Sequence, residues 1–445
     1  MPGACLLPLI ALALALAGPP DDPSALVARL GPARPAGREE AARALEAMGR
    51  GALPALLAAG DAPDPEARAR ASGSGDGIQR SLMARPTPVR LDGEGRTLAE
   101  VVRSLGEQGG FSLGAVNQGS DRPVDARDPG PMPFWEAVDR LGLKGGYFDI
   151  SNPVGGYFPT LNFGGDGDFC PTTTSGPFRV KLTGLHESRD RLLIGGPWLR
   201  VDEISQRIPI RRGAKGREGR FYAGVGLMVE PRMWFTQEGP ARAIEAVDDL
   251  GQSLVPPDGA GGRGAVTLFH NGGGVTAGDV EVDLAMPDRP GRAIVRLRGS
   301  VPVALQQRRP KPALDVALAG SEGKSFELDE VTLTFRSVRE GPTGTVVVVD
   351  AKLNLDRAEL PPGRPAALIT SRLRCLSGHQ VEIVDAAGVV LTGYGGGGTR
   401  PDGTGQLNLS VSKNMTKATP ARFRYYGMIR AFVDVAFEFR NIPMP

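Results

Sequence analysis

The sequence predicts a multi-domain chain with a short α-helical repeat, a small α+β module and two tandem all-β, sandwich-like domains. Its 445 residues correspond to about three domains at roughly 150 residues each. The 62 glycines and 39 prolines show no Gly-X-Y period, which favours a loop-rich, β-rich chain. Apolar residues follow helical spacing near the N-terminus and alternate along most of the second half, as strands do.

The charge balance argues against a nucleic-acid partner. Lys and Arg number 52 against 50 Asp and Glu, and eight of the 52 are Lys. With abundant Ala, Gly and Pro, this excess of Arg is typical of a high-G+C bacterial coding bias rather than of a binding surface. Only three His and three Cys are present, so His-based catalysis and metal sites have little material.

Residues 1–17 are expected to form a signal peptide. The apolar run Leu6–Ala17 suits an export signal and is short for a membrane span. An apolar helix packed on the fold is the alternative interpretation. No later stretch reaches the length of a membrane span, so we expect an exported chain, periplasmic or extracellular, with no transmembrane span after signal removal. There Cys170 and Cys375 form a disulfide or remain separate buried thiols.

Residues 18–75 are expected to hold helices and end in a linker. Apolar stripes at helical spacing are centred on Leu26, Leu45 and Leu56. Asp64-Pro65-Glu66 is a helix start, and Ser72–Gly77 (SGSGDG) is typical of a flexible linker. Residues 38–68 (REEAARALEAMGRGALPALLAAGDAPDPEAR) resemble a HEAT-type repeat, which implies a protein-interaction solenoid. One repeat needs a neighbour or a partner to bury both faces.

Residues 84–155 are expected to form a βαββαβ module. Thr97 and Glu100 make a capping box before an amphipathic helix, and Pro133–Leu141 is a second helix. The segments 89–113 (VRLDGEGRTLAEVVRSLGEQGGFSL) and 133–148 (PFWEAVDRLGLKGGYF) resemble the secretin and TonB N-terminus short domain. The resemblance implies an envelope docking module without catalytic residues; a generic α+β spacer is the alternative.

Two β-sandwich-like domains are expected at 177–310 and 311–445, the second a duplication of the first. Residues 246–254 (AVDDLGQSL) match 383–391 (IVDAAGVVL), and residues 298–305 match 430–437. The shared Asp-x-x-Gly predicts a tight turn between strands. The run 429–442 is expected to be a central strand whose core face carries Val433, Val435, Phe437 and Phe439.

The search for chemistry yields no catalytic, cofactor or metal residues. Gly320–Ser325 lacks the first glycine of a phosphate loop, and a strand pattern rather than a helix follows it. Ligand contact is expected at Trp234, which alternates in a predicted strand, and along the basic stretch 207–220, which could bind anionic glycans. A solvated loop is the alternative for that stretch, whose basic residues are Arg207, Arg211, Arg212, Lys215, Arg217 and Arg220.

The sequence therefore predicts an exported, non-catalytic envelope protein that acts as a protein-interaction or scaffold module. It implies no cofactor and an envelope protein as partner. The alternative function is glycan binding by the two β domains. A hydrolase whose site assembles from scattered carboxylates is a third hypothesis, which no motif supports.

Overall fold

The structure is a computed structural model of the chain, and it falls into two compact units, residues 1–85 and 86–445. The residues that the structure describes are 22–31, 35–111, 114–115, 121, 123–141, 147–149, 160–162, 172–175, 177–188, 220–257, 267–268, 277–287, 289, 291–354, 380–391, 393–399, 404–413 and 416–444. The expected signal peptide and both Cys170 and Cys375 lie outside these ranges.

The first unit is helical and has its own apolar core. Asp22 and Asp64 cap two of the helices, with side chains that accept from the backbone N–H of Ser24 and Glu66, and a proline follows each cap. Leu26, Leu45, Leu56 and Ile78 pack into one buried cluster. The elements are α2 (Pro23–Ala28), α3 (Pro35–Met48), the 3-10 turn η1 (Gly49–Ala52), α4 (Leu53–Ala59) and α5 (Pro65–Met83).

The expected linker at Ser72–Gly77 is wrong, because these residues lie inside α5. A glycine in a helix interior costs about 0.8–1 kcal/mol relative to alanine. Packing of the helix offsets that cost: Ala71 and Ile78, which flank the glycine-rich stretch, are buried in the core of the unit. Composition alone pointed to a flexible segment, and tertiary contacts overrode it.

The second unit opens with helices and short strands. The capping box of α6 is confirmed: the Thr97 side chain accepts from the backbone N–H of Glu100, and the Glu100 carboxylate accepts from the backbone N–H of Thr97. β1 pairs with β5, β2 with β4, and β7 with β3 and β6. The elements are β1 (Pro88–Asp92), β2 (Arg96–Thr97), α6 (Leu98–Gly109), β3 (Gly114–Ala115), β4 (Pro123–Val124), β5 (Arg127–Pro133), α7 (Phe134–Arg140), β6 (Tyr147–Asp149) and β7 (Thr160–Asn162).

Strand β5 was not predicted, because Arg127–Pro133 (RDPGPMP) holds three prolines and a glycine. A proline cannot donate to a ladder, which confines it to edges and strand ends. In the described residues β5 pairs with β1 alone, so one of its sides needs no donors. The short β1–β5 sheet and both helices then share one core that includes Val89, Leu105 and Trp135.

Two sheets form the first β domain. One has the strand order β13-β14-β10-β9-β8, and in the other β15 lies between β25 and the successive strands β11 and β12. The first sheet contains β8 (Thr172–Ser175), β9 (Phe178–Ser188), β10 (Arg220–Val229), β13 (Thr267–Leu268) and β14 (Ala277–Leu284). The second contains β11 (Trp234–Gln237), β12 (Arg242–Asp248), β15 (Ala293–Arg308) and β25 (Met428–Pro443).

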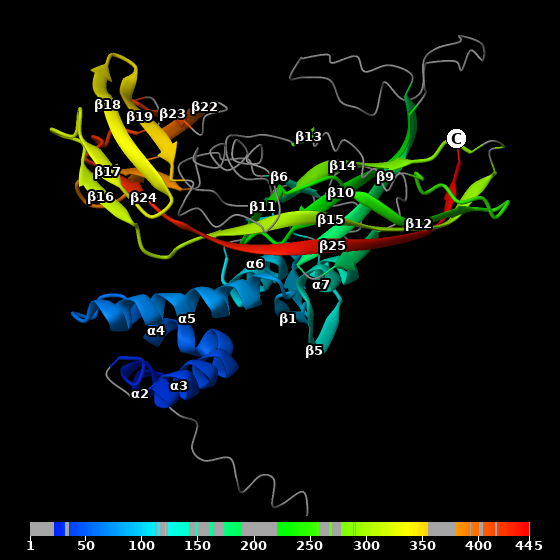
Figure 1. Ribbon diagram of the computed structural model, residues 1–445, viewed down its shortest axis with the longest axis horizontal. Helices are drawn as coiled ribbons and strands as arrows, with labels where there is room; N and C mark the ends of the chain where they lie inside the picture. Colours follow the sequence, from blue (N-terminus) through cyan, green and yellow to red (C-terminus); the bar gives the residue numbers. More distant parts are fainter. Residues whose placement is uncertain are drawn as a thin grey trace, which may run out of the picture. The chain divides into compact units, whose positions relative to one another are not determined.

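The long strands β15 and β25 change the expected domain plan. They pair antiparallel from Ala293↔Pro443 to Arg308↔Met428 and run side by side in Figure 1. The last strand of the chain thus completes a sheet of the first β domain, and residues 309–427 lie between the two strands as an insertion. The expected boundary at 310/311 leaves β25 in the second β domain, whereas its pairing with β15 makes it a strand of the first.

The apparent repeat of residues 298–305 in 430–437 has a direct structural meaning. Both segments lie in this one strand pair, where Val301 faces Val435 and Arg298 faces Glu438. Neighbouring strands of one sheet share a buried face and an exposed face, so their sequences alternate alike. This match therefore gives no separate support to a duplication.

The C-terminal strand has the expected core face but not the expected place. Val435, Phe437 and Phe439 are buried, Val433 is half-buried, and Phe432 on the other face is 37% exposed. Among the described strands of its sheet, β25 pairs only with β15, so it is an edge strand rather than a central one. Strands β8 and β9 of the other sheet lie close to it, which is one way of shielding an edge.

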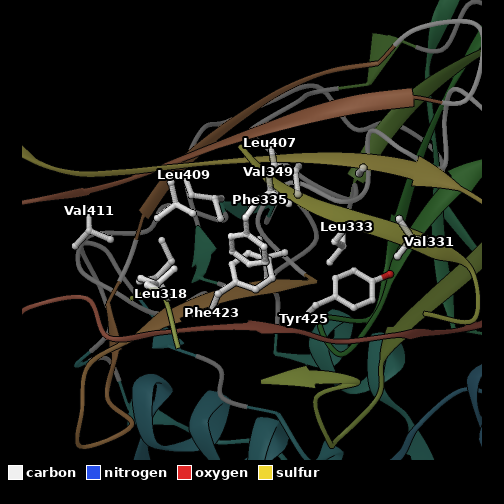
Figure 2. Close-up of a cluster of buried hydrophobic side chains, with 14 of the residues drawn as sticks. Leu318, Val331, Leu333, Phe335, Val349, Leu407, Leu409, Val411, Phe423 and Tyr425 are labelled. Atoms are coloured by element: carbon white, nitrogen blue, oxygen red, sulfur yellow. The ribbon is translucent and has the colours of Figure 1, made fainter. Parts of the chain in front are cut away.

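The inserted domain also has two sheets, which share one core. Their strand orders are β16-β24-β20-β21 and β17-β18-β19-β23-β22. Figure 2 shows Phe335 from one sheet against Phe423 from the other, with ring centroids 5.0 Å apart in edge contact. The strands are β16 (Leu314–Ala317), β17 (Ser325–Glu327), β18 (Val331–Gly341), β19 (Gly344–Leu353), β20 (Val381–Val384), β21 (Val390–Leu391), β22 (Gly393–Thr399), β23 (Thr404–Ser412) and β24 (Arg422–Tyr425).

Both Asp-x-x-Gly turns are confirmed. The Asp248 carboxylate accepts from the backbone N–H of Leu250 (3.0 Å) and Gln252 (2.7 Å). Asp385 accepts in the same way from Ala387 (2.9 Å) and Val389 (2.8 Å). The glycine of each turn is left-handed, with φ of 78° at Gly251 and 85° at Gly388, a region that glycine enters without strain. One local signal therefore builds the same turn in both β domains.

Candidate functional site

Of the predicted ligand contacts, only Trp234 has a described side chain. It lies half-buried in β11, opposite Gln306 of β15. Arg220 begins β10, and its side chain is outside the described part. The other predicted residues also lie outside the described ranges: Arg207, Arg211, Arg212, Lys215 and Arg217.

Beside Trp234, one sheet face carries buried polar groups. Thr236 is 5% exposed, Gln306 1% and Glu238 2%. The Gln306 amide donates to the Thr236 hydroxyl at 3.1 Å, and that hydroxyl donates to the Glu238 carboxylate at 2.8 Å. Buried polar atoms are costly unless they are hydrogen-bonded. This short chain of bonds therefore fixes the three side chains.

Farther along the same strands, charged residues fasten the inserted domain to the first β domain. Arg308 of β15 pairs with Glu382 of β20 at 2.6 Å, and its guanidinium lies 4.0 Å over the Tyr426 ring. Arg430 of β25, only 4% exposed, pairs with Glu330. Each of the two connecting strands thus supplies one arginine to a carboxylate of the inserted domain. We call this group the junction cluster; its members are Arg308, Glu330, Gln380, Glu382, Tyr425, Tyr426 and Arg430.

Two tyrosines complete the junction cluster. The Tyr425 hydroxyl accepts from the Gln380 amide at 3.2 Å, and the Tyr426 hydroxyl donates to Glu382 at 2.7 Å. Burial, followed by the charge of Glu330, raises the pKa of Tyr425 above its usual range. Burial and the bond to Glu382 raise the pKa of Tyr426 in the same direction. Both phenols are therefore held neutral, as donors or acceptors of hydrogen bonds.

A second group of buried polar residues joins the helix-containing part of the second unit to the first β domain. Glu230 is fully buried, and its carboxylate accepts from the backbone N–H of Thr87 at 2.8 Å and from the Thr87 hydroxyl. Arg232 donates to it at 3.0 Å, and 7% of the arginine side chain is exposed. These charge-assisted bonds neutralise a carboxylate that would otherwise be expensive to bury.

The indole of Trp135 strengthens this contact. Its N–H donates to the carbonyl of Pro177 at 3.0 Å, and the same carbonyl accepts from the backbone N–H of Glu230 at 3.1 Å. A buried indole needs such an acceptor. We call this group the Glu230 joint; its members are Thr87, Trp135, Pro177, Glu230 and Arg232.

The polar side chains of these two groups bond mainly to one another. Neither contains His or Cys, and the Thr87 hydroxyl that donates to the Glu230 carboxylate belongs to a buried pair. Within the described ranges, no cluster of three or more His, Cys, Asp or Glu side chains could hold a metal ion. No helix among the described residues is long and apolar enough to cross a bilayer.

Comparisons with known proteins found no match: no family model, curated protein or solved structure is similar to this chain.

Sequence reasoning did not find the Glu230 joint or the junction cluster. Glu230 lies 143 residues from Thr87, and Arg430 lies 100 residues from Glu330. A single charged residue in a strand pattern gives no sign of such a distant partner. The alternation of 429–442 gave no signal either, because it places Arg430 with Phe432 and Asp434 on the face opposite the expected core face.

Proposed function

We propose that this chain is an exported, non-catalytic envelope protein that acts as a protein-interaction or scaffold module. One observation carries the proposal: two of the four buried charged residues that the structure describes, Glu230 and Arg430, lie at joints between parts of the second unit. Glu230 and Arg232 fasten one part, while Arg430 and Glu330 fasten another. Ionisable groups spent on holding domains together suit a rigid scaffold better than an enzyme.

The N-terminal helical unit is the proposed contact surface. It resembles a HEAT-type repeat, a class of module that stacks on neighbours or partners. The unit has its own apolar core, and Leu57 on α4 is 41% exposed. The α+β part, with its resemblance to the secretin and TonB short domain, is the second proposed contact in the envelope.

Glycan binding by the two β-sandwich-like domains is the second candidate function. The half-buried Trp234 favours it, because aromatic rings commonly line small-molecule sites. The basic stretch that ends at Arg220 would supply charge for an acidic glycan.

Cross-linked capture of the tagged chain from its native envelope, with protein and glycan both identified, tests the two functions. The informative deletion is residues 22–85, which stops before Thr87 and so leaves the Glu230 joint intact. We expect a discrete protein partner that this deletion releases and Trp234→Ala retains. Glycan that the deletion variant retains and Trp234→Ala loses would instead establish the second function. A protein partner that survives the deletion would contradict the proposed contact surface.

A further inference from the structure

The inserted domain contains a small open pocket at one end of its β18–β19 hairpin. The pocket encloses about 240 Å³ and lies between that hairpin, the end of β23 and the chain that leads to β24. Its lining residues are Glu340, Thr345, Val411, Ser412, Lys413, Thr416, Lys417, Ala418, Thr419 and Pro420. None of them belongs to the junction cluster or to the Glu230 joint, so the pocket is free of those structural roles.

The lining combines three kinds of group. Val411, which is 3% exposed, Ala418 and Pro420 supply apolar surface. Four hydroxyl-bearing residues line the same space: Thr345, Ser412, Thr416 and Thr419. Apolar contact with a few placed hydroxyls is the usual composition of a small-molecule site. A sugar ring, with its C–H faces and hydroxyl edge, matches that composition.

The two lysines of the pocket differ in what holds them. Lys413 donates to the carbonyl of Gly341 at 3.2 Å and pairs with Glu340 at 3.3 Å, so its charge is partly neutralised and its position fixed. Lys417 is exposed, and among the residues that the structure describes none forms an ion pair with it. A second ammonium group with no carboxylate of its own leaves the pocket with a net positive charge, which attracts an anion.

The local backbone fixes the segment that carries Lys417. The backbone N–H of Thr416 donates to the carbonyl of Ser412 at 3.2 Å, and the Thr416 hydroxyl accepts from the N–H of Ala418 at 3.1 Å. Ala418 also packs against the core of the inserted domain. The segment is thereby anchored on both sides of Lys417, and binding needs little further ordering of the chain.

We propose that this pocket binds an acidic sugar unit, a monosaccharide ring that carries a carboxylate. The cavity is smaller than the roughly 300–1,000 Å³ typical of drug-sized ligands, and a single ring suits it. The ring packs on Val411, Ala418 and Pro420, its hydroxyls bond to the Ser and Thr side chains, and its carboxylate pairs with Lys417. This site is independent of the proposed scaffold role, and it requires neither Trp234 nor the basic stretch.

Ligand-observed NMR on the full chain with glucuronate, glucose and inorganic phosphate tests the proposal. We expect saturable glucuronate binding, weaker binding of glucose, and poor displacement of glucuronate by phosphate. Lys417→Ala should weaken glucuronate binding about fivefold, the upper range for one exposed ion pair. Lys352→Ala is the matched control, since Lys352 is an exposed lysine on β19 outside the pocket lining, and it should leave binding unchanged.

A second variant separates the pocket from simple charge attraction. Thr419 is exposed, so Thr419→Trp should fold normally and fill the space sterically, abolishing glucuronate binding while Lys417 remains. Equal losses in Lys417→Ala and Lys352→Ala, or unchanged binding in Thr419→Trp, would overturn the site. Displacement by phosphate as strong as by glucuronate itself would overturn the sugar assignment, because the ring would then contribute nothing.

Discussion

The two joints of the second unit achieve the same result with different chemistry. The Glu230 joint is built on one carboxylate that is fully buried and accepts from Thr87 and from Arg232. The junction cluster uses two Arg–Glu pairs with partial access to water: 36% of the Arg308 side chain and 22% of the Glu330 side chain are exposed. The Glu230 joint is excluded from water, whereas the junction cluster is partly exposed to solvent.

This difference in access to water predicts which joint responds to salt and pH. Charges in a water-excluded site are screened little by salt, and losing one partner leaves an uncompensated charge. Pairs that reach solvent are weaker and respond more to salt and pH. We therefore expect the Glu230 joint to hold under all conditions in which the domain is folded. In the junction cluster, the strength of the attachment of the inserted domain should decrease gradually as salt or pH rises.

The largest effect is expected when the Glu230 joint is broken. Glu230→Ala removes the acceptor of both Thr87 bonds and leaves the Arg232 guanidinium without this carboxylate, at a cost of about 3–5 kcal/mol of unfolding free energy. Denaturant unfolding measures it. Glu245→Ala is the control, because Glu245 makes a half-exposed 3.4 Å pair with Arg296 and should cost at most about 1 kcal/mol. Similar losses in both variants would remove the distinction.

A smaller loss is expected at the junction cluster. Glu330→Gln takes the carboxylate from Arg430, which is 4% exposed, and should cost about 2 kcal/mol. Glu382→Gln should cost about 1 kcal/mol, because Arg308 reaches solvent and also stacks on Tyr426. Denaturant unfolding at low and high salt compares the two. A Glu330→Gln loss as large as that of Glu230→Ala would mean that the joint is effectively dry.

Alkaline pH should weaken the junction cluster. It should not affect the Glu230 joint, because that joint contains no tyrosine. The folded pKa of Tyr425 is raised, so its contribution is complete below the unfolded value of about 10 and is lost as the pH rises toward the folded value. The wild-type chain should lose about 1.4 kcal/mol more per pH unit above 10 than Tyr425→Phe. Unfolding curves at pH 9 and 11 measure this, and equal slopes would contradict the buried, neutral phenol.

The smallest effect is expected in helix α5, where the change tested is in backbone freedom rather than in charge. Gly73 and Gly77 lie within α5 and have nothing within 4 Å of an added Cβ. Gly73→Ala and Gly77→Ala should each stabilise the helix by about 0.8–1 kcal/mol, seen as slower amide exchange along α5. Gly110→Ala is the opposing control, because Gly110 has φ of 78° and should lose stability. Faster exchange in the first two variants would argue for the flexible linker that composition suggested.

Local features were the part that could be predicted. The capping box at Thr97, the turns at Asp248 and Asp385, and the buried face of 435–439 each depend on residues a few positions apart. The order of helices first and strands afterwards follows from apolar spacing. The strand β5 was not predicted because its three prolines argue against a strand. Proline is nevertheless compatible with a strand that pairs on one side only.

Nothing comparable could be predicted for the joints. Arg308 and Glu382 lie 74 residues apart, and the local pattern does not distinguish them from the charged residues of other strands. The pocket at Lys417 shows the same limit, since its walls come from the β18–β19 hairpin and from a segment about 70 residues further on. Among the predicted contacts, Trp234 alone has a described side chain. It lies next to the buried side chains of Thr236 and Gln306, which no sequence motif predicted.

By itself the sequence determined where helices cap, where strands turn and which face of each element is apolar, because these follow from backbone geometry and short-range spacing. Only the tertiary structure decided that 72–77 is helical, that β25 returns to β15 and that residues 309–427 are an insertion. Those outcomes depend on burying apolar faces and satisfying charges across long separations. Many strand pairings satisfy the local pattern equally well, and only the packed core selects one of them.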